Sequence, residues 1–257
     1  MDIEATNFDI TADEPCGDDD SANGCPCTYP IFSFRTDYLF DKVAYTDGGR
    51  YQVDGQLIQI DDIQLYLSNF AFRYTSGEWT QVTDTIGVAI QNEAGLKDTI
   101  LTDDFVLINQ QSSFDVGAIQ RSGTFDSLRF LVGIMHPANT VNPDSVSRSR
   151  HPLTETEMHT GDVGTGYIFS RFVFRKDTLE NTVATTLTVS QHIGSGKIVP
   201  IQMPISTKSS IESKFFVGTL TINHAKWFDG IKFVTDSDEA MIEKLVANTP
   251  TVFSIVN

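Results

Sequence analysis

The chain has 257 residues, 40% of them hydrophobic, so it can bury a core as one large domain or two small ones. Its 34 acidic and 18 basic residues give a formal net charge of −16, the wrong sign for binding nucleic-acid phosphates. The longest nearly continuous apolar run, 130–135, is far shorter than the roughly 20 residues of a membrane-spanning helix, so no transmembrane segment is expected.

Residues 1–28 are predicted to form an acidic leader or linker that cannot build a core, because they are rich in Gly, Asp, Ser, Asn and Pro. Met1–Ile10 shows neither the basic nor the apolar region of a secretion signal, so we expect that any signal has been removed or was never present. The three cysteines, Cys16, Cys25 and Cys27, all lie in this leader. In an exported protein, Cys16 would form a disulfide with either Cys25 or Cys27 and leave one thiol over.

The leader also contains Asp18, Asp19 and Asp20, followed by Asn23 and Gly24. These oxygen-bearing side chains could chelate calcium, but their spacing does not match an EF-hand loop. A solvated acidic linker is the better interpretation.

Residues 29–257 are predicted to fold as one antiparallel β-sandwich, an all-β domain with one short C-terminal helix. Short β-branched and aromatic segments alternate there with glycine-containing turn signals. The predicted strands are Ile31–Arg35, Gln56–Ile60, Ile63–Tyr74, Trp79–Thr83, Phe105–Ile108, Phe125–Ile134, Tyr167–Arg175, Thr182–His192, Lys197–Ile205, Phe215–His224 and Val252–Val256.

The C-terminal helix is predicted to start with Asp236 as its N-cap, because Glu239 follows three residues later in a pattern that resembles a capping box. An apolar helix face then follows, formed by Met241, Ile242, Leu245 and Val246. The polar stretch 137–166 has no clear periodicity, and long loops in compact domains are often functional.

The five histidines are the main candidates for chemistry. His136 closes the apolar strand before Pro137, and strand phase places His192 on a polar face, so for both a ligand role and a solvated strand-end role stay open. His224 shares phase with buried positions and is expected in the core or at an edge. His151 and His159, in the long loop, are expected to be solvated.

Met135, next to His136, would add a soft copper ligand, but adjacent strand residues point apart, so Met135 is expected in the core. We find no nucleophile elbow, phosphate loop or zinc-protease helix, so no enzyme activity is expected. The carboxylate pairs Asp61-Asp62 and Asp103-Asp104 are adjacent in sequence, face opposite sides of a strand and are expected in solvated turns.

Several segments, in this order and spacing, resemble the MbnP-like domain family of copper-associated β-sandwich proteins from the bacterial envelope. They are Ile63-Gln64-Leu65-Tyr66-Leu67-Ser68-Asn69, Phe130-Leu131-Val132-Gly133-Ile134, Pro152-Leu153 followed by Met158, Gly166-Tyr167-Ile168-Phe169, and Gln191-His192-Ile193-Gly194. The resemblance covers roughly residues 29–256.

The resemblance implies a copper site in an extracytoplasmic protein, which is periplasmic, secreted or attached to the cell surface. Copper-binding family members are described as using histidine and an oxidised tryptophan. His192 matches the family histidine and His136 is the nearest second one, but the tryptophans of this chain, Trp79 and Trp227, lie elsewhere. His159, ahead of His151, is therefore expected to replace the tryptophan, since imidazole is itself a good copper ligand.

The preferred interpretation is non-catalytic copper binding through His136, His192 and His159. The alternative is a structural or adhesive surface protein that self-associates through edge strands or its leader and has lost the copper site. A third hypothesis, a calcium-dependent carbohydrate-binding module, rests only on architecture and acidity.

Overall fold

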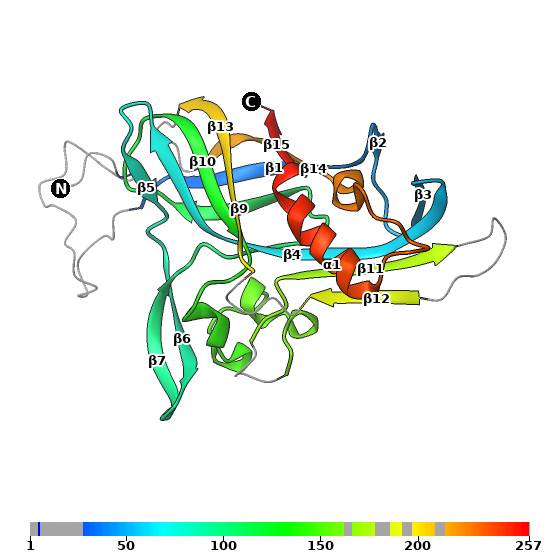
Figure 1. The fold of residues 1–257 in the computed structure, drawn as a ribbon. Helices are drawn as coiled ribbons and strands as arrows, with labels where there is room; N and C mark the ends of the chain where they lie inside the picture. The colour runs from blue at the N-terminus through cyan, green and yellow to red at the C-terminus, as the bar shows by residue number, and fades with distance from the viewer. Residues whose placement is uncertain are drawn as a thin grey trace, which may run out of the picture.

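The computed structural model describes residue 5 and residues 28–161, 166–177, 186–191, 197–208 and 214–256. It confirms the predicted all-β sandwich with a short C-terminal helix (Figure 1). In chain order the elements are β1 (Ile31–Phe40), β2 (Val43–Ala44), β3 (Gly49–Val53), β4 (Gln56–Tyr74), β5 (Trp79–Gln81), β6 (Thr85–Asn92), β7 (Gly95–Thr102), β8 (Val106–Ile108), β9 (Ser113–Ala118), β10 (Thr124–Val132), η1 (Ala138–Thr140), η2 (Pro143–Ser145), η3 (Pro152–Thr154), η4 (Thr156–Met158), β11 (Ser170–Asp177), β12 (Thr186–Gln191), β13 (Val199–Lys208), β14 (Lys214–Asn223), η5 (His224–Phe228), α1 (Asp238–Asn248), η6 (Thr249–Thr251) and β15 (Phe253–Val256).

The larger sheet is built around β4, a strand of 19 residues. Its order is β12-β11-β4-β10-β13, and β3, β5 and β8 also pair with β4. The sequence predicts two strands here, but β4 runs on through Asp61 and Asp62. These carboxylates do not lie in solvated turns, as expected, because Asp61 pairs with Arg175 at 2.8 Å and Asp62 with Arg171 at 2.6 Å, both on the neighbouring β11.

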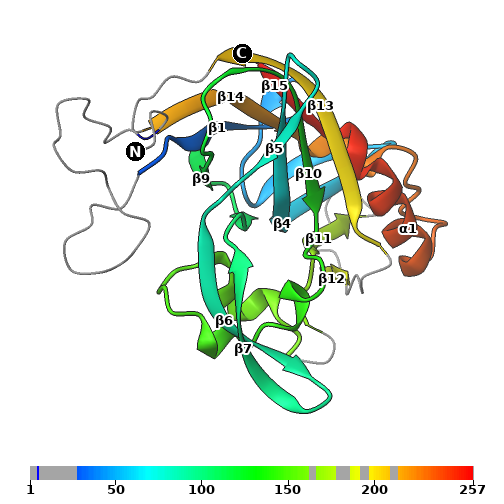
Figure 2. The same cartoon turned by 90° about the vertical axis from the view of Figure 1, so that its left-hand side faces the viewer.

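The smaller sheet has the order β15-β14-β1-β2, with β9 also paired to β1. Within the described strands β1 and β14 run parallel, and this pair departs from the antiparallel pattern of the predicted sandwich. Figure 2 shows β1 and β14 crossing over one end of β4 and β10. The chain connecting these parallel strands includes the whole larger sheet.

The core between the two sheets, called here the sandwich core, is rich in phenylalanine. The ring of Phe32 lies 4.9 Å from that of Phe72 and 5.6 Å from that of Phe125, which joins the two sheets. Phe70 stacks on Phe130 at 5.3 Å within the larger sheet. Each such aromatic pair contributes about 0.5–1.5 kcal/mol beyond the burial of its area.

A two-stranded hairpin, β6–β7, projects from the body of the sandwich (Figures 1 and 2). The sequence pattern did not predict this hairpin. Its base packs on a second buried cluster, called here the loop cluster, formed mainly by the segment that follows β10. The members are Tyr66, Ile86, Val88, Phe105, Ile134, Ala138, Val141, Leu153, Met158, Tyr167, Ile168 and Phe169.

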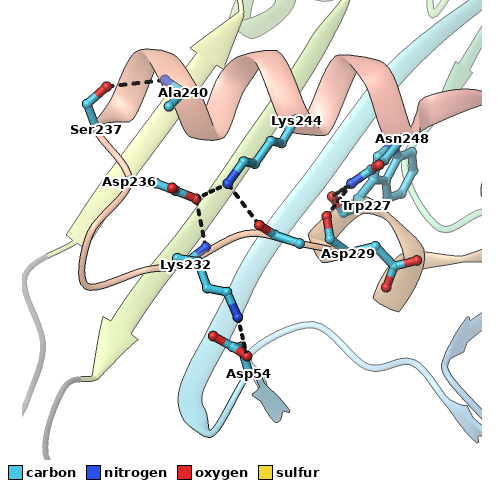
Figure 3. Close-up of polar contacts among 10 residues, drawn as sticks. Asp54, Trp227, Asp229, Lys232, Asp236, Ser237, Ala240, Lys244 and Asn248 are labelled. Carbon is cyan, nitrogen blue, oxygen red and sulfur yellow. Dashed lines mark hydrogen bonds and ion pairs between the residues drawn. The ribbon is translucent and has the colours of Figure 1, made fainter.

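The C-terminal helix begins one residue later than predicted. Ser237 is the N-cap, and its hydroxyl accepts a hydrogen bond from the backbone N–H of Ala240. Asp236 instead accepts from the backbone N–H of Lys232 and pairs with the Nζ atom of Lys244 at 2.6 Å, as Figure 3 shows. Asp236 therefore fastens the helix to the chain that leads into it.

The predicted apolar helix face is present, with Met241 and Leu245 fully buried in the sandwich core. Among the described residues, no helix is long and apolar enough to cross a membrane. The leader cysteines Cys16, Cys25 and Cys27 lie outside the described residues, as do the calcium candidates at 18–20.

Candidate metal site

His136 lies just beyond the end of β10, where the chain leaves the larger sheet. The side chain is exposed, and the peptide bond between His136 and Pro137 is cis. Met135 is also exposed, at 48%, although the sequence predicts it in the core. The chain has left the ladder before Met135, so strand alternation no longer applies to it; its sulfur lies 3.8 Å from the side-chain nitrogen of Asn69.

The loop after His136 is tied to the loop that carries His159. Asn139 accepts a hydrogen bond through its side-chain oxygen from the backbone N–H of Tyr167, at 2.9 Å. Tyr167 in turn forms an isolated β-bridge with His159. Gly166 makes this approach possible, because a Cβ atom there would lie 2.1 Å from the carbonyl oxygen of Asn139 and its φ of 72° favours glycine.

His159 is half-buried, and its ring packs edge-on against Tyr167 with 4.8 Å between ring centres. The Nδ1 atom accepts a hydrogen bond from the backbone N–H of Gly161 at 3.0 Å. The Nε2 atom of His159 is itself buried from solvent. The sequence predicts a solvated side chain for His159. The β-bridge and the ring contact with Tyr167 partly bury it instead.

Two buried tyrosines, Tyr66 and Tyr167, also bind the loop that carries His159. The Tyr66 hydroxyl donates to the carbonyl oxygen of Pro152, and the Tyr167 hydroxyl donates to that of Leu153, both at 2.8 Å. Burial raises the pKa of both hydroxyls well above the usual value, so both stay protonated donors.

His192, the histidine that matches the family motif, lies outside the described residues. Gln191, the residue before it, is the last residue of β12 and pairs with Ser170 at the start of β11. Ser170 also pairs with Leu65 in β4. β12 therefore ends, at Gln191, beside the start of β11, which begins three residues after Tyr167.

His151 is buried and paired, which corrects the expectation that it is solvated. Its Nε2 atom lies 2.8 Å from Asp103, and its Nδ1 atom accepts from the backbone N–H of Leu153 at 3.1 Å. Asp103 also pairs with Arg148. Because both ring nitrogens are engaged, His151 serves the loop structure and cannot readily replace a metal ligand.

Asp103 and Asp104 lie in the segment between β7 and β8, and their carboxylates turn to different partners. Neither is solvated, however. Asp104 is 7% exposed and accepts from the backbone N–H of Phe70 at 2.9 Å. Burial raises the pKa of Asp104 to about 6, an effect that its backbone hydrogen bonds only partly oppose.

His224 is buried in the sandwich core, as the strand phase predicts. It is 1% exposed and packs among Tyr38, Tyr45 and Trp227, with neither ring nitrogen hydrogen-bonded. Burial lowers the pKa of its imidazole to about 3.

The tryptophans both lie away from His136 and His159. Trp227 is fully buried and donates through Nε1 to the Thr249 hydroxyl at 3.2 Å. Trp79 lies on β5 beside Arg129. Among the described residues, no three His, Cys, Asp or Glu side chains come close enough together to hold a metal ion.

Comparison with known proteins places the chain in a family. The model of the MbnP family matches residues 31–243. The chain belongs to the MbnP family. Among solved structures, MbnP from Methylosinus trichosporium matches with 12% sequence identity and a TM-score of 0.45, covering 80% of this chain and 79% of that one. The search of curated proteins found no match.

Proposed function

We propose that this MbnP family member binds copper outside the cytoplasm, through imidazole nitrogens of His136, His159 and His192, without catalysing a reaction. The observation that carries the proposal is the linkage at one end of the larger sheet. Tyr167 joins the loop that follows His136, through Asn139, to the loop that carries His159. β11 begins three residues after Tyr167 and pairs there with the end of β12, which immediately precedes His192 in the sequence.

The donor set suits copper. Neutral imidazole is a good ligand for copper. The hydrogen bond that Nδ1 of His159 accepts from Gly161 orients the ring, so that Nε2 is the coordinating atom. His192 is the decisive third ligand of this proposal.

Copper affinity of purified variants tests the site. We expect the metal-stripped protein to take up about one equivalent of copper, and the double variant His136→Ala/His192→Ala to bind orders of magnitude more weakly, because two nitrogen ligands are lost. His159→Ala alone should weaken binding by about tenfold or more, the scale of losing a metal-site partner. His151→Gln is the matched control, since it removes an imidazole outside the site. Unchanged affinity in the double variant would reject the site.

The extracytoplasmic location is tested separately, by fractionating the native cells. We expect the protein in the periplasmic, secreted or surface-exposed fraction, where a copper-binding protein of this family would meet the metal. Recovery in the cytoplasmic fraction alone would contradict this part of the proposal.

A second function, self-association as a surface protein, is favoured by one observation. Within the described strands β7 pairs with β6 alone, so its outer edge is open, and Leu96 and Ile100 on it are 57% and 73% exposed. Light scattering distinguishes the two functions: a dimer that Ile100→Lys disrupts supports assembly, and a strict monomer at all concentrations argues against it.

A further inference from the structure

The outer face of the larger sheet holds a recess of about 520 Å³ with no histidine among its described lining residues. It lies over β4, β10 and β13, away from the sandwich core. This volume is within the range of about 300–1,000 Å³ found for small-molecule sites. The lining residues are Asn69, Arg129, Phe130, Leu131, Pro200, Ile201 and Gln202.

Among the residues that the structure describes, Arg129 is the only charged one that lines this recess. Its guanidinium lies over the ring of Trp79, 4.4 Å from the ring centre, and forms no ion pair within the described part of the chain. The other arginine near Trp79, Arg73, is paired with Asp126 at 2.8 Å. An aromatic face under a guanidinium fixes the plane of the group and leaves its N–H edge for a bidentate partner.

Asn69 presents a polar side chain to the same recess because β4 bulges at this point. The pairing register with β10 shifts between Arg129 and Leu131, and Asn69 has a left-handed φ of 57°. Asparagine tolerates this conformation better than most residues, and such backbone often marks a functional position. Gln202, exposed on β13 opposite Arg129, supplies a second amide.

The floor between these polar groups is apolar. Leu131 is half-buried and Pro200 is exposed, and both line the recess beside Arg129. Apolar contact with a few placed amides and one cation is the arrangement that small-molecule sites use for orientation and specificity. A sugar ring offers C–H faces for such a floor and hydroxyls for the amides.

The geometry points to a second binding site, in which Arg129 grips the carboxylate of a uronic-acid unit of an acidic saccharide. The amides of Asn69 and Gln202 bind its hydroxyls, and Leu131 and Pro200 support the ring. Trp79 is a positioning residue, because it holds the Arg129 guanidinium and does not line the recess. This site is independent of copper.

Calorimetric titration of the whole chain with a galacturonate trisaccharide tests the site, with the neutral galactose trisaccharide and citrate as comparison ligands. We expect the acidic trisaccharide to bind, and the neutral sugar and citrate to bind at least tenfold more weakly. Arg129→Gln should reduce affinity by tenfold or more, since a bidentate charge-assisted contact is lost. Arg129→Lys should also bind weakly, because lysine keeps the charge but lacks the planar fork.

Arg50→Gln is the matched control, since Arg50 is exposed on β3, outside the recess. It should bind as the wild type does, and equal melting temperatures would show that all variants are folded. Three results would overturn the proposal: no binding of the acidic trisaccharide at millimolar concentration, equal binding of citrate, or wild-type affinity in Arg129→Gln.

Discussion

His224 in the sandwich core and His151 beside the loop cluster are both buried, yet their surroundings differ. His224 packs among aromatic rings with no hydrogen bond to either nitrogen, whereas His151 has Asp103 at Nε2 and the Leu153 N–H at Nδ1. Because Nδ1 accepts, Nε2 carries the proton that is donated to the carboxylate. Burial alone therefore does not define what a histidine does: one fills space and the other fastens a loop.

The largest expected effect is an acid sensitivity that comes from His224. Its pKa is about 3 in the fold and 6.5 ordinarily, so the unfolded chain binds the proton more readily. The free energy of unfolding is therefore unaffected by this group above pH 6.5. It falls as the pH drops from 6.5 towards 3, by up to about 5 kcal/mol.

Replacing His224 by phenylalanine should remove this dependence. Urea unfolding of the metal-free protein should show that wild type loses about 2 kcal/mol more than His224→Phe between pH 6.5 and pH 5. The exposed His136→Phe is the matched control and should follow the wild type. Parallel pH profiles for wild type and His224→Phe would contradict the unpaired, buried state of this ring.

Asp104 should produce a pH dependence of opposite sign. Burial raises the pKa of Asp104 to about 6, so the folded chain favours the protonated carboxyl. The protonated carboxyl therefore adds to the free energy of unfolding below about pH 4, and this stabilisation is lost as the pH rises through 6. Asp104→Asn keeps an oxygen that can accept the Phe70 N–H. The difference in unfolding free energy between Asp104→Asn and wild type should rise by about 2 kcal/mol from pH 4 to pH 7. A constant difference across that range would show that the carboxyl is not desolvated.

The smallest expected effect sharpens the comparison most, because the same substitution should have opposite signs at the two histidines. His151→Phe leaves the Leu153 N–H unpaired and Asp103 without its imidazole partner, which costs about 1–3 kcal/mol. His224→Phe at neutral pH removes two unpaired nitrogens and should be neutral or stabilising. Thermal unfolding at pH 7 measures the stability of both variants. An equal loss of stability in His151→Phe and His224→Phe would contradict the different roles given to the two histidines.

Local pattern predicted much of this fold. Alternation and turn residues placed most strands of the sandwich within a few residues, and periodicity found α1, although Ser237 takes the capping role expected of Asp236. The β6–β7 hairpin was not predicted. β7 has no fully buried residue, and β6 alternates between exposed and buried residues only over its first four, Thr85–Val88, so the burial pattern that marks a sheet strand is short here.

The polar contacts could not be predicted, because their partners are distant in sequence. His151 meets Asp103 across 48 residues, and Arg171 meets Asp62 across 109. The guanidinium of Arg129 reaches Trp79 from a different strand, and neither residue alone signals a site. Sequence spacing identifies candidate side chains, but tertiary pairing decides which of them are already engaged.

The most direct test of the copper proposal is X-ray absorption spectroscopy of the copper-loaded full chain. Coordination by His136, His159 and His192 predicts a first shell of nitrogen ligands, with the imidazole scattering pattern, that loses a nitrogen in His192→Ala. A first shell dominated by sulfur would contradict the account, because it would place copper on the leader cysteines Cys16, Cys25 and Cys27 or on Met135.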